Sequence, residues 1–204
     1  MDADEFTQRV RDDNETPLSR LGSSKSLYAL TGGEMDGDAV RAAVAREATL
    51  TAAAVADWTD TDGTDEATAE LYDDLAARAE SHAETAGAAP SDRAYPELDR
   101  LAAATSTPER LGALLARQIL AETRIGQAVG FFVGDADPTS ADEFRSLRDD
   151  HQTDLERVAD RLDDVCAEDD WTTAREAADD LLEAAYDDYV ATLESMGVKP
   201  KNVC

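Results

Sequence analysis

The sequence has little cysteine, little lysine and no long apolar run, and each shortage excludes a class of protein. Its two cysteines, Cys166 and Cys204, are too few for a disulfide framework. No stretch approaches the roughly 18 apolar residues that a membrane helix needs, and the first residues lack the apolar core of a signal peptide. We therefore expect a soluble, cytoplasmic protein.

Positive charge is scarce as well. The 204 residues include 46 Asp and Glu against 19 Lys and Arg, a formal net charge of −27, and lysine occurs at Lys25, Lys199 and Lys201 alone. A surface this acidic repels nucleic acids and anionic membranes, so we expect the chain to bind neither directly. Its acidic runs are expected to hold hydrated cations weakly.

This charge balance is typical of proteins from extreme halophiles, where molar salt screens the repulsion between acidic side chains. A disordered acidic chain is the alternative. However, 42% of the residues are hydrophobic, and they recur with a helical period. The acidic composition is therefore better evidence for a high-salt habitat than for a particular binding partner.

Strand signals are nearly absent, and the period of an α-helix dominates the apolar pattern. Proline, glycine and capping residues mark the helix ends clearly. The pattern predicts a leading helix, four long helices, a short helix before the third of these, and a trailing helix, at 17–32, 39–59, 66–86, 96–101, 108–130, 140–165 and 173–196.

These helices predict an all-α four-helix bundle with an additional N-terminal and C-terminal helix. The chain is long enough for one sizeable core and contains no linker that would divide it. We expect a single domain over residues 1–198, in which 38–165 form the core bundle and 199–204 form a tail.

Two glutamates and the two histidines occupy corresponding positions in this arrangement. Glu47 lies mid-span in the first long helix and His82 follows in the second. Glu122 lies mid-span in the third, and His151 follows in the fourth. Bundles that hold two irons take a Glu from two helices and Glu-x-x-His from the other two. Carboxylate and imidazole ligands together suit iron or manganese.

This layout resembles the ferritin-like superfamily, its rubrerythrin-like members in particular, over residues 38–165. The resemblance implies a ferritin-like bundle and metal-ligand roles for those four residues. The sequence departs from the family where Glu should precede each histidine by three residues, because Ala79 and Arg148 stand there. We expect Arg148 to bring positive charge to the centre and to pair with Glu47 or Glu122.

Three interpretations of the four residues remain open. They are inert polar residues of the core, or a residual one-metal site for zinc, iron or manganese, or a metal-free pocket gated by Arg148. We expect a non-catalytic binding or regulatory module with a degenerate di-iron site and no cofactor. The alternative is an iron- or manganese-dependent oxidoreductase with an altered ligand set.

A second candidate region lies at residues 18–36. Its Gly-Ser-Ser-Lys segment lacks the spacing and the preceding strand of a phosphate loop. We predict instead a short amphipathic helix across the end of the bundle. Ser23, Ser24 and Lys25 are expected to line the mouth of a pocket.

The same region and the ending VKPKNVC also resemble small haloarchaeal proteins that carry a transcription-antitermination label. The resemblance implies a regulatory role through protein contacts. Direct RNA binding is not expected, because no basic patch with interleaved aromatic residues is present.

Two further features concern reactivity and assembly. Lys199 and Lys201 lie close to Cys204 and favour a reactive thiolate there, and the alternative is an inert thiol in a disordered tail.

The apolar segment AVGFFV, at 128–133, ends a predicted helix and needs cover. We therefore expect a homodimer.

Overall fold

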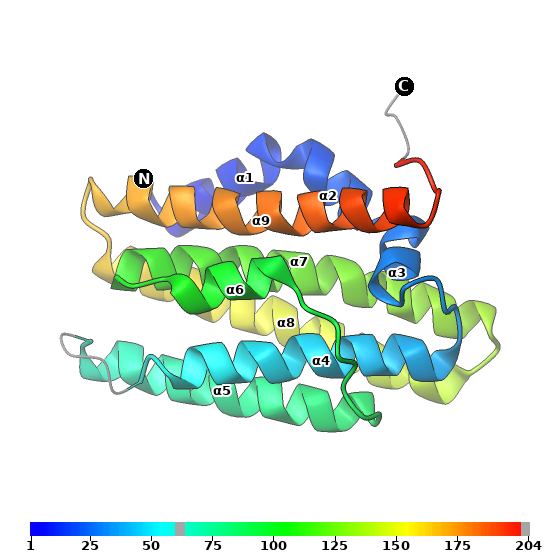
Figure 1. Ribbon diagram of the computed structural model, residues 1–204. Helices are drawn as coiled ribbons and strands as arrows, with labels where there is room; N and C mark the ends of the chain where they lie inside the picture. The colour runs from blue at the N-terminus through cyan, green and yellow to red at the C-terminus, as the bar shows by residue number, and fades with distance from the viewer. Residues whose placement is uncertain (60–63, 201–204) are drawn as a thin grey trace.

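The computed structural model describes residues 1–59 and 64–200 (Figure 1). Within these ranges every regular element is an α-helix and no strand occurs, which confirms the all-α prediction. None of these helices has the length and apolar character needed to cross a membrane. In chain order they are α1 (Ala3–Asp13), α2 (Glu15–Leu21), α3 (Ser24–Leu30), α4 (Gly37–Ala56), α5 (Glu66–Ala86), α6 (Pro96–Ala103), α7 (Thr107–Gly134), α8 (Pro138–Val165) and α9 (Asp170–Ser195).

Two antiparallel helix pairs form the centre of the molecule. α4 packs along α5, α7 packs along α8, and the two pairs lie against each other (Figure 1). From the end of α5 the chain runs back along the bundle to the start of α7, and α6 lies in this connection. As a result α4 runs antiparallel to α7, and α5 runs antiparallel to α8.

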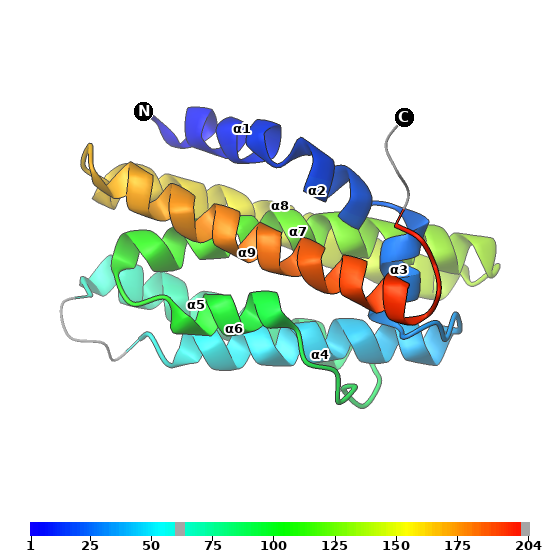
Figure 2. The same ribbon diagram turned by 45° about the horizontal axis from the view of Figure 1, so that its top comes forward.

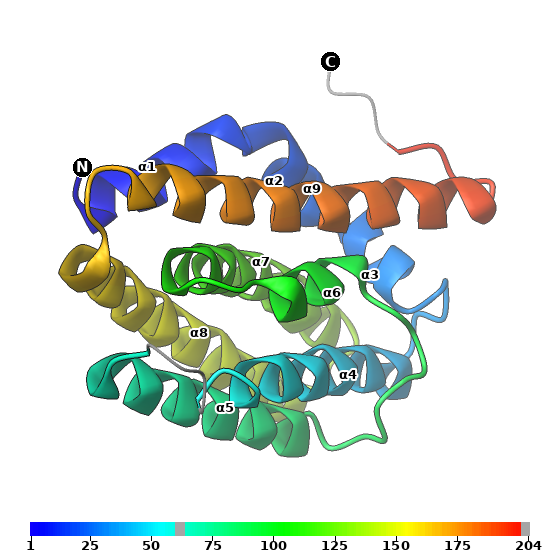
Figure 3. The same cartoon turned by 60° about the vertical axis from the view of Figure 1, so that its left-hand side comes forward.

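α9, α1 and α2 lie on the side of the α7–α8 pair away from α4, whereas α6 lies between α9 and α4, and α3 contacts α7, α9 and α4 (Figure 1). α9 packs along α7 and α6, and α1 and α2 pack against α9 (Figures 2 and 3). α7 is therefore enclosed between the other helices, and most of its side chains are buried. Buried apolar residues from all nine described helices form one continuous core.

The N-terminal part differs from the single leading helix that the sequence predicts. Three helices occur there, because the chain breaks at Asn14 and again at Gly22 and Ser23. The apolar pattern does not predict α1, which is short and acidic. α1 is held by Phe6, whose ring centroid lies 5.3 Å from that of Trp171 on α9. This helix therefore depends on a contact distant in sequence.

Helix ends follow local hydrogen bonding. α7 begins with a capping box, in which the backbone N–H of Ser106 donates to the Glu109 carboxylate and lowers the pKa of that carboxyl to about 2. α8 begins earlier than predicted because the Asp137 carboxylate accepts from the backbone N–H of Ser140. α9 likewise begins earlier, at Asp170.

The apolar segment at the end of α7 is mostly covered by the chain itself. Phe132 is buried against Phe144 on α8, with ring centroids 4.9 Å apart, and Phe131 is half-buried. Val133 remains 56% exposed. The segment therefore gives little reason for a homodimer, which stays a prediction.

Gly112 marks a close approach of α7 to α9. A methyl group there would collide with the backbone carbonyl of Ala174, whereas one at Gly126 in the same helix would meet open space. We expect Gly112→Ala to lower the free energy of unfolding by about 1–3 kcal/mol, the usual cost of overpacking. The control Gly126→Ala should raise it by up to about 1 kcal/mol, since alanine favours helix. Urea unfolding measures both, and equal effects would contradict the close approach.

Candidate functional site

The structure buries three of the four residues that the sequence predicts as ligands. Glu47 on α4, His82 on α5 and His151 on α8 are 3%, 5% and 8% exposed. Glu122 on α7 lies towards α1 instead, where its carboxylate is 3.2 Å from the Arg11 guanidinium. The four side chains therefore do not converge on one point.

The two histidines are in contact. Their ring centroids lie 4.7 Å apart between α5 and α8. Nδ1 of His151 donates to Oε1 of Gln118 on α7 at 2.6 Å. Nε2 of His82 lies 3.5 Å from the Asp150 carboxylate. The structure thus brings together the two residues that occupy corresponding places in the two helix pairs.

Burial keeps both imidazoles uncharged near neutral pH. It lowers the pKa of His82, which Asp150 partly opposes. It lowers the pKa of His151 well below its usual 6.5, and the neighbouring His82 and Arg117 add to this effect. A neutral imidazole donates one hydrogen bond and accepts another, and it is also the form that binds metals.

Glu47 is engaged by an arginine. Its carboxylate accepts a short hydrogen bond from Nη1 of Arg124 on α7, and the same nitrogen donates to Glu97 on α6 at 2.6 Å. All three side chains are nearly inaccessible to solvent. Burial alone would lower the pKa of Arg124, but the carboxylates of Glu47 and Glu97 outweigh it and raise that pKa. Arg124 therefore stays charged and joins α4, α6 and α7.

Arg124 is the last of three buried arginines that recur at seven-residue intervals on α7. Two helical turns separate consecutive members, so all three share the face towards α4. The Arg117 Nε donates to the hydroxyl of Thr51 at 3.0 Å, and the Arg110 guanidinium lies 5.4 Å from the centre of the Trp58 ring. The sequence interpretation missed this series, although Arg at regular intervals on the most apolar helix was a visible signal.

The residues present do not fit the two-metal centre that the family resemblance implies. Arg124 binds Glu47, Glu122 pairs with Arg11, and Ala79 stands where a bridging Glu would be. Among residues 1–59 and 64–200 no three His, Cys, Asp or Glu side chains are grouped to hold an ion. The polar core is built from guanidinium, carboxylate and imidazole groups that bind one another.

The expectation for Arg148 is wrong. Its side chain is 44% exposed and lies 3.6 Å from the neighbouring Asp149. The inward positions of this part of α8 belong to Leu147 and His151, and Arg148 is rotated off that face. Positive charge does reach Glu47, but from Arg124 on α7.

A small cavity lies beside the histidine pair, between the two helix pairs. Its volume is about 10 Å³, which is room for one water-sized species. Apolar side chains form much of the wall, including that of Ala79, and the polar lining residues are Thr51, His82, Arg117, Gln118, His151 and Asp154. The short side chain of Ala79 is one of the groups that border this space.

Asp154 connects the cavity to the α5–α8 contact. Its carboxylate is 3% exposed and lies 2.7 Å from Nε of Arg78 on α5. Burial raises the pKa of Asp154 to about 6, although Arg78 opposes the rise. Further out, Arg157 pairs with Asp74 at 2.8 Å. A row of ion pairs therefore leads from the histidines along the surface of α5 and α8.

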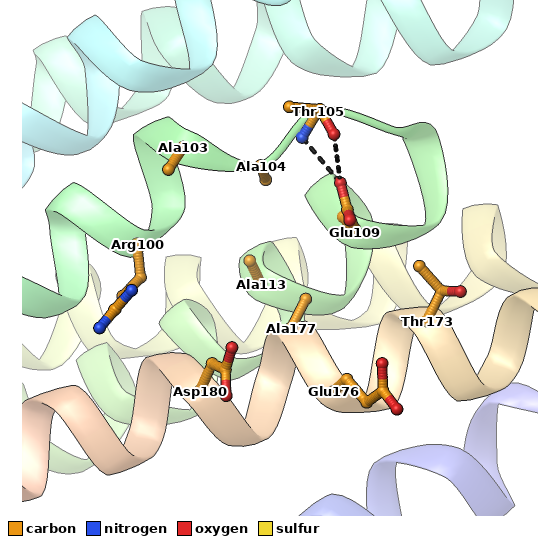
Figure 4. Close-up of a pocket in the computed structure, with 10 residues that line it drawn as sticks. All are labelled: Arg100, Ala103, Ala104, Thr105, Glu109, Ala113, Thr173, Glu176, Ala177 and Asp180. Atoms are coloured by element: carbon orange, nitrogen blue, oxygen red, sulfur yellow. Dashed lines mark hydrogen bonds between the residues drawn. The ribbon is translucent and has the colours of Figure 1, made fainter.

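A hollow at the surface has a different character from the core cavity (Figure 4). It measures about 250 Å³ and lies between α6, the start of α7 and α9. Arg100 projects on one side and Asp180 and Glu176 on the other, above a floor of alanines (Figure 4). These charged side chains are exposed, and the Glu109 carboxylate at its rim is occupied by the α7 capping box. The hollow thus lacks the buried polar groups that distinguish the core.

Ser23, Ser24 and Lys25 line neither of the two cavities described above. Ser23 begins α3 and its hydroxyl donates to the Arg20 carbonyl at 2.7 Å, while Ser24 is exposed. Nζ of Lys25 donates to the Lys199 carbonyl at 2.8 Å. Ser23 and Lys25 thus bind backbone carbonyls, and a pocket mouth at these residues stays a prediction. The predicted reactive thiol, Cys204, lies outside the described residues.

Removal of Arg124 should be costly, because it leaves the carboxylates of Glu47 and Glu97 buried without a counter-charge. We expect Arg124→Ala to lower the free energy of unfolding by about 3–5 kcal/mol. Arg11→Ala breaks the half-exposed pair with Glu122 and should cost less than about 1 kcal/mol. The triple variant Arg124→Met/Glu47→Gln/Glu97→Gln removes all three buried charges together. It should lower the free energy of unfolding far less than Arg124→Ala does. Similar losses in all three variants would show that the core pair is not desolvated.

The lowered pKa of His151 predicts a loss of stability in mild acid. Between that lowered value and the usual 6.5, the unfolded state binds a proton that the folded state does not. The contribution of His151 is therefore complete above pH 6.5 and decreases as the pH falls below it. The raised pKa of Asp154 has the opposite effect on stability as the pH falls. Because the wild type and the His151→Gln variant both contain Asp154, this effect cancels when the two are compared. Urea unfolding between about pH 7 and pH 5 should show a larger loss in the wild type than in His151→Gln. Parallel profiles would exclude a neutral, buried His151.

Comparison with known proteins adds no family to this description. No protein-family model matches the chain, and neither curated proteins nor solved structures gave a match. The resemblance to ferritin-like proteins therefore stays a prediction from the sequence, made on the positions of Glu47, His82, Glu122 and His151 and on the order of the helices.

Proposed function

We propose that the chain is a ferritin-like, rubrerythrin-like protein without catalytic activity, in which an arginine–carboxylate network replaces the di-iron centre. It would act as a binding or regulatory module. The helix arrangement supports this proposal, because two antiparallel pairs joined by one connection along the bundle are the layout of ferritin-like folds.

One observation carries the proposal. Arg124 donates to Glu47 and Glu97 inside the bundle, so a guanidinium supplies the positive charge that a metal ion supplies in a carboxylate-bridged centre. A metal ion at Glu47 would have to displace Arg124 and leave a charged guanidinium buried. That displacement costs several kcal/mol in a desolvated site.

Metal content tests the proposal. The protein is stripped with a chelator, loaded separately with Fe(II), Mn(II) or Zn(II), desalted in high salt, and measured by mass spectrometry of the metals. We expect far less than one ion per chain and no turnover of peroxide. The His82→Ala/His151→Ala variant is the control for cations held on the acidic surface, and it should retain the same trace amount as the wild type.

A metal-dependent oxidoreductase is the second candidate, and the histidine pair favours it. Both imidazoles are neutral and in contact, which is the state in which they bind metals. This candidate predicts at least one ion per chain in the wild type, lost in the double histidine variant, together with peroxide or oxygen turnover. That result would overturn the first proposal.

A further inference from the structure

We propose that the core cavity beside the histidine pair binds a single halide ion, chloride in physiological salt, on the guanidinium of Arg117. This goes beyond the proposed function and does not depend on it, because it rests on the surroundings of Arg117 alone. It would be a site between α4, α5, α7 and α8.

The buried arginines of α7 are not balanced equally. Arg124 donates to two carboxylates, those of Glu47 and Glu97, whereas Arg117 donates through Nε to the neutral hydroxyl of Thr51. Nη1 of Arg117 has no hydrogen-bond partner within the described part of the chain. A buried guanidinium nitrogen without a partner carries a desolvation cost that a bound anion would offset.

Arg117 also lines the cavity. Its side chain is 3% exposed, and the cavity of about 10 Å³ admits one species of roughly the size of water. Phosphate, sulfate and organic anions are too large for that space. The apolar walls favour a weakly hydrated halide.

The other charged group at the cavity is paired with two arginines, although its Oδ1 accepts no hydrogen bond within the described part of the chain. The Asp154 carboxylate lies 2.7 Å from Arg78 and 3.8 Å from Arg157. His82 and His151 are uncharged at neutral pH because burial lowers the pKa of both. Burial also lowers the pKa of Arg117, and the carboxylates of Glu47 and Glu97 oppose this only in part. An anion is therefore the complement that the cavity lacks.

Halide replacement tests the proposal in two ways. Crystals grown with bromide in place of chloride should show an anomalous peak in the cavity beside Arg117. In solution, the folding equilibrium constant at fixed ionic strength should rise about tenfold for each tenfold increase in chloride above its Kd, with gluconate making up the balance.

Two variants remove the site by different routes. Arg117→Gln removes the charge, and Ala79→Val, with two added methyl groups, fills the cavity while Arg117 stays. Both variants should unfold cooperatively in urea and lose the chloride dependence. Arg110→Gln is the matched control, because Arg110 is on the same face of α7 and contacts Trp58 instead of the cavity. It should keep the dependence. A water molecule in place of bromide, or the same chloride dependence in Ala79→Val as in the wild type, would overturn the proposal.

Discussion

The buried ion pair of Arg124 with Glu47 and Glu97 constrains the centre of this structure. Three charges leave water together, and each is tolerable only while the others remain in place. Because the three residues come from α7, α4 and α6, the pair fixes the distance between the two helix pairs and holds the connection between them. Arg117 and Arg110 extend the same contact along α7, so long side chains fill a gap that shorter apolar residues would leave open.

The network also decides what the centre can do. A carboxylate that accepts hydrogen bonds from a buried guanidinium is not available to a cation unless the guanidinium moves. The histidine pair lies outside that constraint, since its imidazoles are neutral and contact each other, Gln118 and Asp150. The two halves of the polar core thus differ in chemistry: one half is a closed ion pair, and the other is a cavity lined by neutral imidazoles, Arg117 and the Asp154 carboxylate.

Much of the fold follows from local sequence signals. α5 has the predicted bounds because Asp65 caps its start and Gly87 adopts a left-handed conformation at its end. α1 could not be predicted in this way, since its stability comes from Trp171 far along the chain. Glu122 was placed on the wrong face for a related reason. α7 is buried between neighbouring helices over most of its surface, so its sequence pattern does not show which of its polar residues faces α4.

A double-mutant cycle on Glu47→Gln and Arg124→Met tests the buried pair itself, with unfolding followed in urea in the presence of a chelator. We expect the two residues to stabilise the fold through each other, with a coupling free energy above about 1 kcal/mol. Additive effects, within about 0.5 kcal/mol, would contradict a direct buried pair and with it the replacement of a metal by arginine.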